Sequence, residues 1–207
     1  MGQAGARRIL ANTSYRAAAD VGSKLISVVF FVVLARSLGD AAFGVFVFGL
    51  SLGSLLAFPA GFGQDQILAR EVARDHRLVD AYFANTLALK LVLAVPILAT
   101  TAVVTGVIDM GGEERAVSIL LATAVFAEQL GGTCWAVFQA YERLAFLPVV
   151  IIFQRGLTAG AGVAALALGA GVVDVAVIYL CAAVLALALA LTLLFREVVA
   201  GRAPRAA

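Results

Sequence analysis

Three basic side chains lie inside long apolar stretches of the sequence, where charged residues are rare. They are Lys24, Lys90 and Arg155. A charge in the hydrocarbon layer of a membrane costs about 2.5–3.5 kcal/mol on insertion scales, so such residues usually have a function. A guanidinium group can hold a phosphate through two parallel hydrogen bonds, and ammonium groups can add point charges beside it. The three residues therefore predict a site for an anionic headgroup.

Other polar residues accompany these cations. Gln154 directly precedes Arg155, and we expect it to join the same substrate site. Two acids, Asp20 and Glu128, also fall within apolar segments. We expect them to tune the cationic patch or to exchange protons or cations during transport. A plainer interpretation is also open: Lys24 can pair with Asp20 one helical turn away, and a deep lysine can extend its amine toward the membrane interface.

The composition indicates an integral membrane protein. Of the 207 residues, 63% are hydrophobic and 14% are charged, against about 25% charged residues in soluble proteins. The apolar segments are long and do not alternate with period two, which favours membrane-spanning helices over strands. The net charge of +2 is too small to indicate nucleic acid as a partner. The expected fold class is therefore all-α.

Six apolar segments are each long enough to cross a hydrocarbon core of about 30 Å, which takes about 20 residues. The expected organisation is a lead over residues 1–16, a six-helix transmembrane lobe over 17–195 and a tail over 196–207. An amphipathic polar stretch predicts a helix lying on the cytoplasmic membrane surface over residues 64–80. The six expected membrane helices cover residues 17–35, 43–60, 83–105, 116–140, 148–170 and 175–195.

The distribution of arginine predicts the orientation of the chain. Six spans place both termini on one side, and cytoplasmic loops are enriched in arginine and lysine. We therefore expect an inner (plasma) membrane protein with both termini in the cytoplasm. Lys24, Lys90 and Arg155 each lie about seven residues into an outward-running helix. This spacing places them roughly 10 Å from the cytoplasmic boundary, where they can form one ring. Ten arginines fall on the side of the termini, namely Arg7, Arg8, Arg16, Arg70, Arg74, Arg77, Arg143, Arg196, Arg202 and Arg205, against Arg36 and Arg115 on the other side.

Motifs for enzyme chemistry are missing from the sequence. It has no phosphate-binding P-loop, no glycine-rich dinucleotide motif after a strand, no zinc-protease motif and no usable serine–histidine–aspartate set. The single histidine, His76, excludes a histidine-based metal cluster within the chain. Cys134 and Cys181 lie in apolar runs, where a disulfide is not expected. We therefore expect no enzyme activity, no cofactor and no bound metal.

Several short motifs between residues 12 and 145 resemble the opening of a known transporter family. Together with Asn12 ahead of the first apolar helix, they resemble the polysaccharide (O-antigen-type) flippases of the multidrug/oligosaccharidyl-lipid/polysaccharide exporter superfamily. The last two expected helices match this family only in hydropathy. The motifs are Ala35-Arg36-Ser37-Leu38-Gly39, Phe43-Gly44-Val45-Phe46, Gly61-Phe62-Gly63, Arg70-Glu71-Val72-Ala73-Arg74 and Gln139-Ala140-Tyr141-Glu142-Arg143.

The resemblance implies a transporter of lipid-linked oligosaccharides that works by alternating access. Its substrate would be a sugar chain on undecaprenyl pyrophosphate, moved from the inner to the outer leaflet. Family members usually hold two lobes of six helices around a cationic cavity, whose residues carry over best to Lys24 and also to Lys90 and Arg155. This chain is about one lobe long. Either the chain is a fragment, or another copy or a separate chain supplies a second lobe. A second lobe is therefore the expected partner, besides the substrate and the lipid bilayer.

Two other functions stay open at this point. A cation- or proton-coupled multidrug exporter of the same superfamily would use Asp20 and Glu128 for its coupling ion, although cationic drugs do not favour three cations in the membrane. The other alternative is a membrane scaffold or fragment that transports nothing. The sequence does not identify the glycan, the driving force or the number of copies that assemble.

Overall fold

The computed structural model describes the backbone of residues 3–61, 63–143 and 146–196, and the side chains within these ranges from residue 21 onward. Every regular element in these ranges is a helix, and they contain no strand. This confirms the predicted all-α fold. Helices satisfy all backbone hydrogen bonds within one segment, which long apolar stretches require where no water is present.

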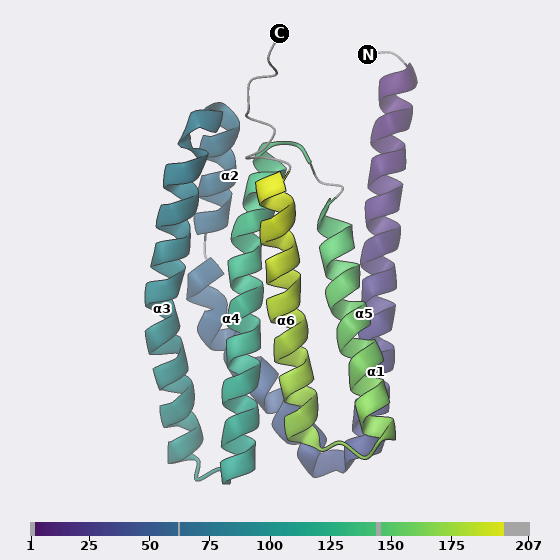
Figure 1. Cartoon of the computed structure of the whole chain (residues 1–207), viewed down its shortest axis with the longest axis vertical. Helices are drawn as coiled ribbons and strands as arrows, with labels where there is room; N and C mark the ends of the chain where they lie inside the picture. The colour runs from purple at the N-terminus through teal and green to yellow at the C-terminus, as the bar shows by residue number, and fades with distance from the viewer. Residues whose placement is uncertain (1–2, 62, 144–145, 197–207) are drawn as a thin grey trace.

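The long helices stand side by side as one upright bundle (Figure 1). The N-terminal end of α1 and the C-terminal end of α6 lie at the same end of this bundle, which agrees with an even number of passes. Which end faces the cytoplasm stays a prediction. The elements are α1 (Gln3–Gly61), α2 (Gln64–Arg74), the short 3₁₀ helix η1 (His76–Leu78), α3 (Val79–Val107), α4 (Gly112–Ala140), α5 (Phe146–Ala167) and α6 (Val172–Leu194).

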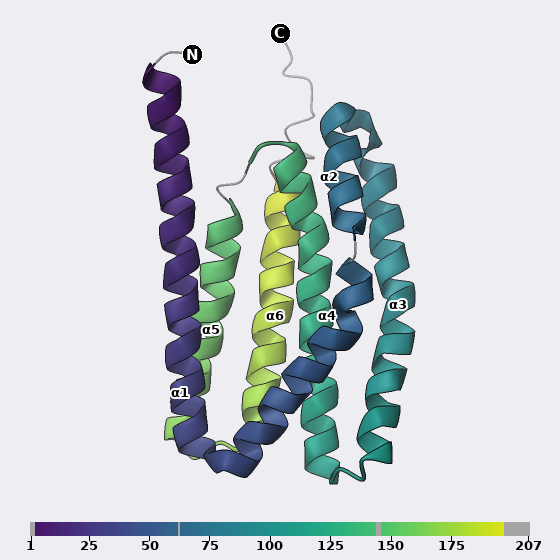
Figure 2. The same ribbon diagram turned by 180° about the vertical axis from the view of Figure 1, so that it is seen from behind.

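α1 is bent at Gly39, so it consists of two helical arms. Figure 2 shows the first arm running beside α5 and the second arm returning obliquely past α4 toward α2. Five segments in the described residues are long and apolar enough to cross a membrane. One of them, Val21–Arg74, includes residues of both arms of α1 and the helix α2 but counts once. The predicted six spans require that each arm of α1 crosses the membrane separately. This stays a prediction.

The bend depends on a backbone conformation that favours glycine. Gly39 has φ 76° and ψ 173°, and residues with a Cβ atom pay about 1–3 kcal/mol to adopt this region. We expect Gly39→Ala to lower the stability of the purified protein by that amount, seen as a lower melting temperature in detergent. Gly44→Ala is the matched control, because a Cβ on Gly44 would meet nothing within 4 Å. An unchanged melting temperature in Gly39→Ala would show that the bend does not need glycine.

The start of α1 differs from the sequence prediction. The lead predicted over residues 1–16 is helical from Gln3 onward. Alanine and arginine, which each occur three times in this stretch, are good helix formers and extend the helix beyond its apolar part. The tail over 196–207 falls almost entirely outside the described residues.

α4 is the central helix of the bundle and contacts each of the other five α-helices. The second arm of α1 packs very closely on it at Gly49 and Gly53, whose spacing is that of a GxxxG motif. A Cβ atom on Gly53 would lie 2.8 Å from the Cα atom of Ala122, and one on Gly49 would lie 3.1 Å from the Cα atom of Ser118. The two glycines therefore serve helix packing, as their spacing indicates.

α2 does not lie across the ends of the bundle, in contrast to the predicted surface helix. In both views it stands alongside α3 (Figures 1 and 2), and it also contacts α4. Leu68 and Val72 of its apolar stripe are fully buried in a cluster with residues of α4, whereas Arg70 and Arg74 stay exposed. The amphipathic pattern is present, and its apolar face packs on protein. The position of α2 relative to a membrane surface stays a prediction.

Candidate functional site

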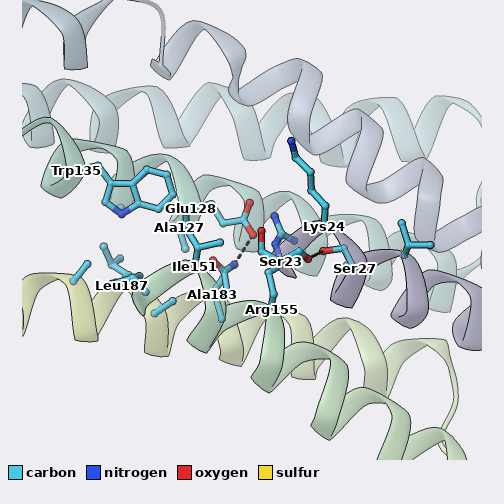
Figure 3. A pocket seen from close by; sticks show the side chains of 16 residues that line it. Ser23, Lys24, Ser27, Ala127, Glu128, Trp135, Ile151, Arg155, Ala183 and Leu187 are labelled. Carbon is cyan, nitrogen blue, oxygen red and sulfur yellow. Dashed lines mark hydrogen bonds between the residues drawn. The ribbon is translucent and has the colours of Figure 1, made fainter. Parts of the chain in front are cut away.

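A pocket of about 590 Å³ lies between α1, α4, α5 and α6. Figure 3 shows its side chains gathered from these helices. Most of the wall is apolar, and a few polar groups converge on it, as is typical of ligand sites. The polar lining residues are Ser23, Lys24 and Ser27 of α1, Glu128 of α4, and Gln154 and Arg155 of α5.

Helix geometry explains why these residues meet. Ser23 and Ser27 are one helical turn apart, so they share a face of α1 with the neighbouring Lys24. Three alanines of α6, at positions 183, 186 and 190, also line the pocket. Their small side chains leave open space where larger apolar residues would fill the bundle.

Glu128 is the centre of a hydrogen-bond network in this pocket. Gln154 Nε2 donates to Glu128 Oε1 at 2.5 Å, and the hydroxyl of Tyr179 donates to the same oxygen at 3.2 Å. The Tyr179 hydroxyl also accepts a hydrogen bond from Arg155 Nη1 at 3.3 Å. The network thus joins an acid, an amide, a phenol and a guanidinium from α4, α5 and α6.

Lys24 and Arg155 both line this pocket, and their role in binding a substrate stays a prediction. Lys24 is exposed, whereas Arg155 is half-buried. Glu128 and Gln154 are also brought together with them. The side chain of Asp20 lies outside the described residues, so its pairing with Lys24 and its role in ion coupling stay predictions.

Lys90 does not line the pocket, which corrects the predicted ring of three cations. Its side chain is fully buried between α2, α3 and α4. Its Nζ donates to Asp65 Oδ1 at 2.8 Å, to Asp65 Oδ2 at 2.9 Å and to the carbonyl oxygen of Gln129 at 2.6 Å. A buried ammonium needs such partners, because its desolvation is otherwise uncompensated. Lys24, Lys90 and Arg155 have similar depths along their helices by residue count, but only Lys24 and Arg155 line the same pocket.

Sequence reasoning missed two residues of these networks, Asp65 and Tyr179. Asp65 belongs to the charged stretch that predicts a surface helix. The signal for its role is Lys90, because a lysine deep in an apolar helix needs a partner acid. Tyr179 is the only aromatic residue with a hydroxyl within the apolar run of α6. Such residues usually bond their hydroxyl when they are buried.

The comparisons with known proteins give one match. A family model described as polysaccharide biosynthesis protein matches residues 9–205. This range contains every residue of the pocket and of the Lys90 ion pair. No curated protein and no solved structure matches the chain.

Proposed function

Because the chain belongs to the polysaccharide biosynthesis protein family, we propose that it translocates lipid-linked glycans across the membrane. The proposed substrate is a sugar chain on undecaprenyl pyrophosphate, moved from the inner to the outer leaflet of the plasma membrane. In this proposal both termini are cytoplasmic, since ten arginines against two lie on their side. Each arm of α1 then crosses the membrane as a span of its own.

The observation that carries the proposal is the joint presence of Lys24 and Arg155 in one pocket within membrane-spanning helices. Among the described residues that line it, Glu128 is the only acid, so two positive charges and one negative charge leave these residues with a net charge of +1. Arg155 has five N–H donors, and one of them is used by Tyr179. The other donors can bind phosphate oxygens in a bidentate fork, with Lys24 as a nearby point charge.

The multidrug-exporter alternative has weaker support. A cationic drug would meet a pocket with a net positive charge, and Glu128 Oε1 already accepts hydrogen bonds from Gln154 and Tyr179.

Transport by alternating access also needs a second body against which this bundle can rock. We therefore propose that the transporter contains a second lobe against which this bundle moves.

The proposal is tested by deleting the chain from its native host. We expect surface glycan to be lost while its lipid-linked precursor accumulates at the inner leaflet, where added glycosidases cannot reach it in intact cells. Sensitivity to cationic dyes should stay unchanged. Normal surface glycan with increased dye sensitivity would instead favour the drug exporter, and no change in either measurement would favour the scaffold.

A further inference from the structure

We propose that Tyr179 is a positioning residue that keeps Arg155 available to an anionic ligand by holding it apart from Glu128. This inference rests on the proposed function, because it concerns the same pocket and assumes that the ligand is a phosphate-bearing anion. Tyr179 itself is not among the side chains that line the pocket.

The hydroxyl of Tyr179 stands between the two charged groups. It accepts from Arg155 Nη1 at 3.3 Å and donates to Glu128 Oε1 at 3.2 Å. A hydroxyl has one proton to donate and two lone pairs to accept with, so both bonds can exist at the same time. Among the described side chains, the ion pairs within 4.0 Å do not include Arg155 with Glu128.

Packing fixes the ring that carries this hydroxyl. Tyr179 is only 5% exposed, and its ring meets Phe46 edge to face, with 6.0 Å between the ring centroids. Phe46 is fully buried and contacts Phe30 and Phe31 in the same way. These aromatic contacts between α1 and α6 hold the hydroxyl in place, since edge-to-face pairs favour one mutual orientation.

Glu128 is held from a second side. Gln154 donates to the same carboxylate oxygen that Tyr179 binds. If the Tyr179 hydroxyl were absent, the carboxylate and the guanidinium would be free to form a direct pair, which is typically short, strong and bidentate. Such a pair would occupy the fork that we assign to phosphate, so an incoming anion would have to displace the carboxylate first.

Tyr179→Phe tests this role because it removes the hydroxyl and keeps the ring that packs on Phe46. We expect the affinity of the purified full chain for inorganic pyrophosphate, measured by calorimetry in detergent, to fall about tenfold, the effect of one charged hydrogen bond. Adding Glu128→Gln to Tyr179→Phe should restore the affinity, since a neutral amide cannot capture Arg155. Thr192→Val is the control, because it removes an exposed hydroxyl of α6 that bonds only to the Ala188 carbonyl.

The possible results separate this inference from the proposed function. If the wild-type chain does not bind pyrophosphate, the phosphate site itself fails, and the positioning role falls with it. If the wild-type chain binds but Tyr179→Phe binds equally well, only the positioning role is overturned. A loss that Glu128→Gln does not reverse would also overturn it, because Tyr179 would then act through general packing or by direct contact with the anion.

Discussion

Arg155→Gln is expected to lower glycan export by about tenfold or more, because charged hydrogen bonds contribute about 1.5–3 kcal/mol each. Glutamine keeps part of the length and polarity of arginine but cannot form the charged fork. Arg155 is half-buried, so water screens its interaction with a phosphate less than it would at an open surface. Export is measured as surface glycan in a deletion strain that expresses the variant, normalised to the amount of protein in the membrane.

Two further variants, one of a lysine in the pocket and one of an arginine outside it, show whether the loss of export depends on the pocket. Lys24→Gln should also reduce export, but less than Arg155→Gln, because Lys24 is exposed and acts as a point charge. Arg36→Gln removes the same charge from α1, at an exposed position outside the pocket lining, and should leave export unchanged. Equal losses in all three variants would mean that net charge matters rather than this pocket. Normal export in Arg155→Gln and Lys24→Gln would rule the phosphate site out.

The sequence predicts those site residues that can be recognised from their position within a single helix. Hydropathy predicts the long helices, and the polar pair Gln154 and Arg155 within an apolar segment predicts a polar site, whose pocket both residues line. The same reasoning applies to Lys24. These assignments depend only on where a charge falls within an apolar stretch, which the sequence states directly.

The unpredictable part depends on how helices are rotated about their axes. Counting residues from the start of a helix gives the depth of Lys90, but it does not tell which neighbour that side chain faces. The partner of Lys90 is Asp65, 25 residues earlier, at the start of a helix that stands upright beside α3. The same limitation hid Tyr179, whose link to Glu128 joins positions 51 residues apart.

The Lys90 ion pair gives the second large expected effect, on stability rather than on export. Lys90→Met is expected to destabilise the protein by about 3–5 kcal/mol, the usual loss when one partner of a buried pair is removed. Asp65, whose side chain is only 22% exposed, would lose the ammonium group that both of its carboxylate oxygens bind. For a chain of this size, 1 kcal/mol shifts the melting temperature by about 2–4 °C, so a fall of roughly 6–20 °C is expected in detergent.

Two further variants show whether the loss of stability comes from breaking the ion pair between Lys90 and Asp65. Lys90→Met combined with Asp65→Asn should regain much of the lost stability, because replacing both ions removes the uncompensated charge. Lys24→Gln removes an exposed lysine and should change the melting temperature little.

The double variant also decides between a structural and a transport role for Lys90. If the pair only ties α2 and α3 to α4, export should recover together with stability. A double variant that is stable but does not export glycan would show that Lys90 takes part in transport, as its position in an apolar helix predicts. Because Lys90 Nζ is already bound by three oxygens, we expect export to recover.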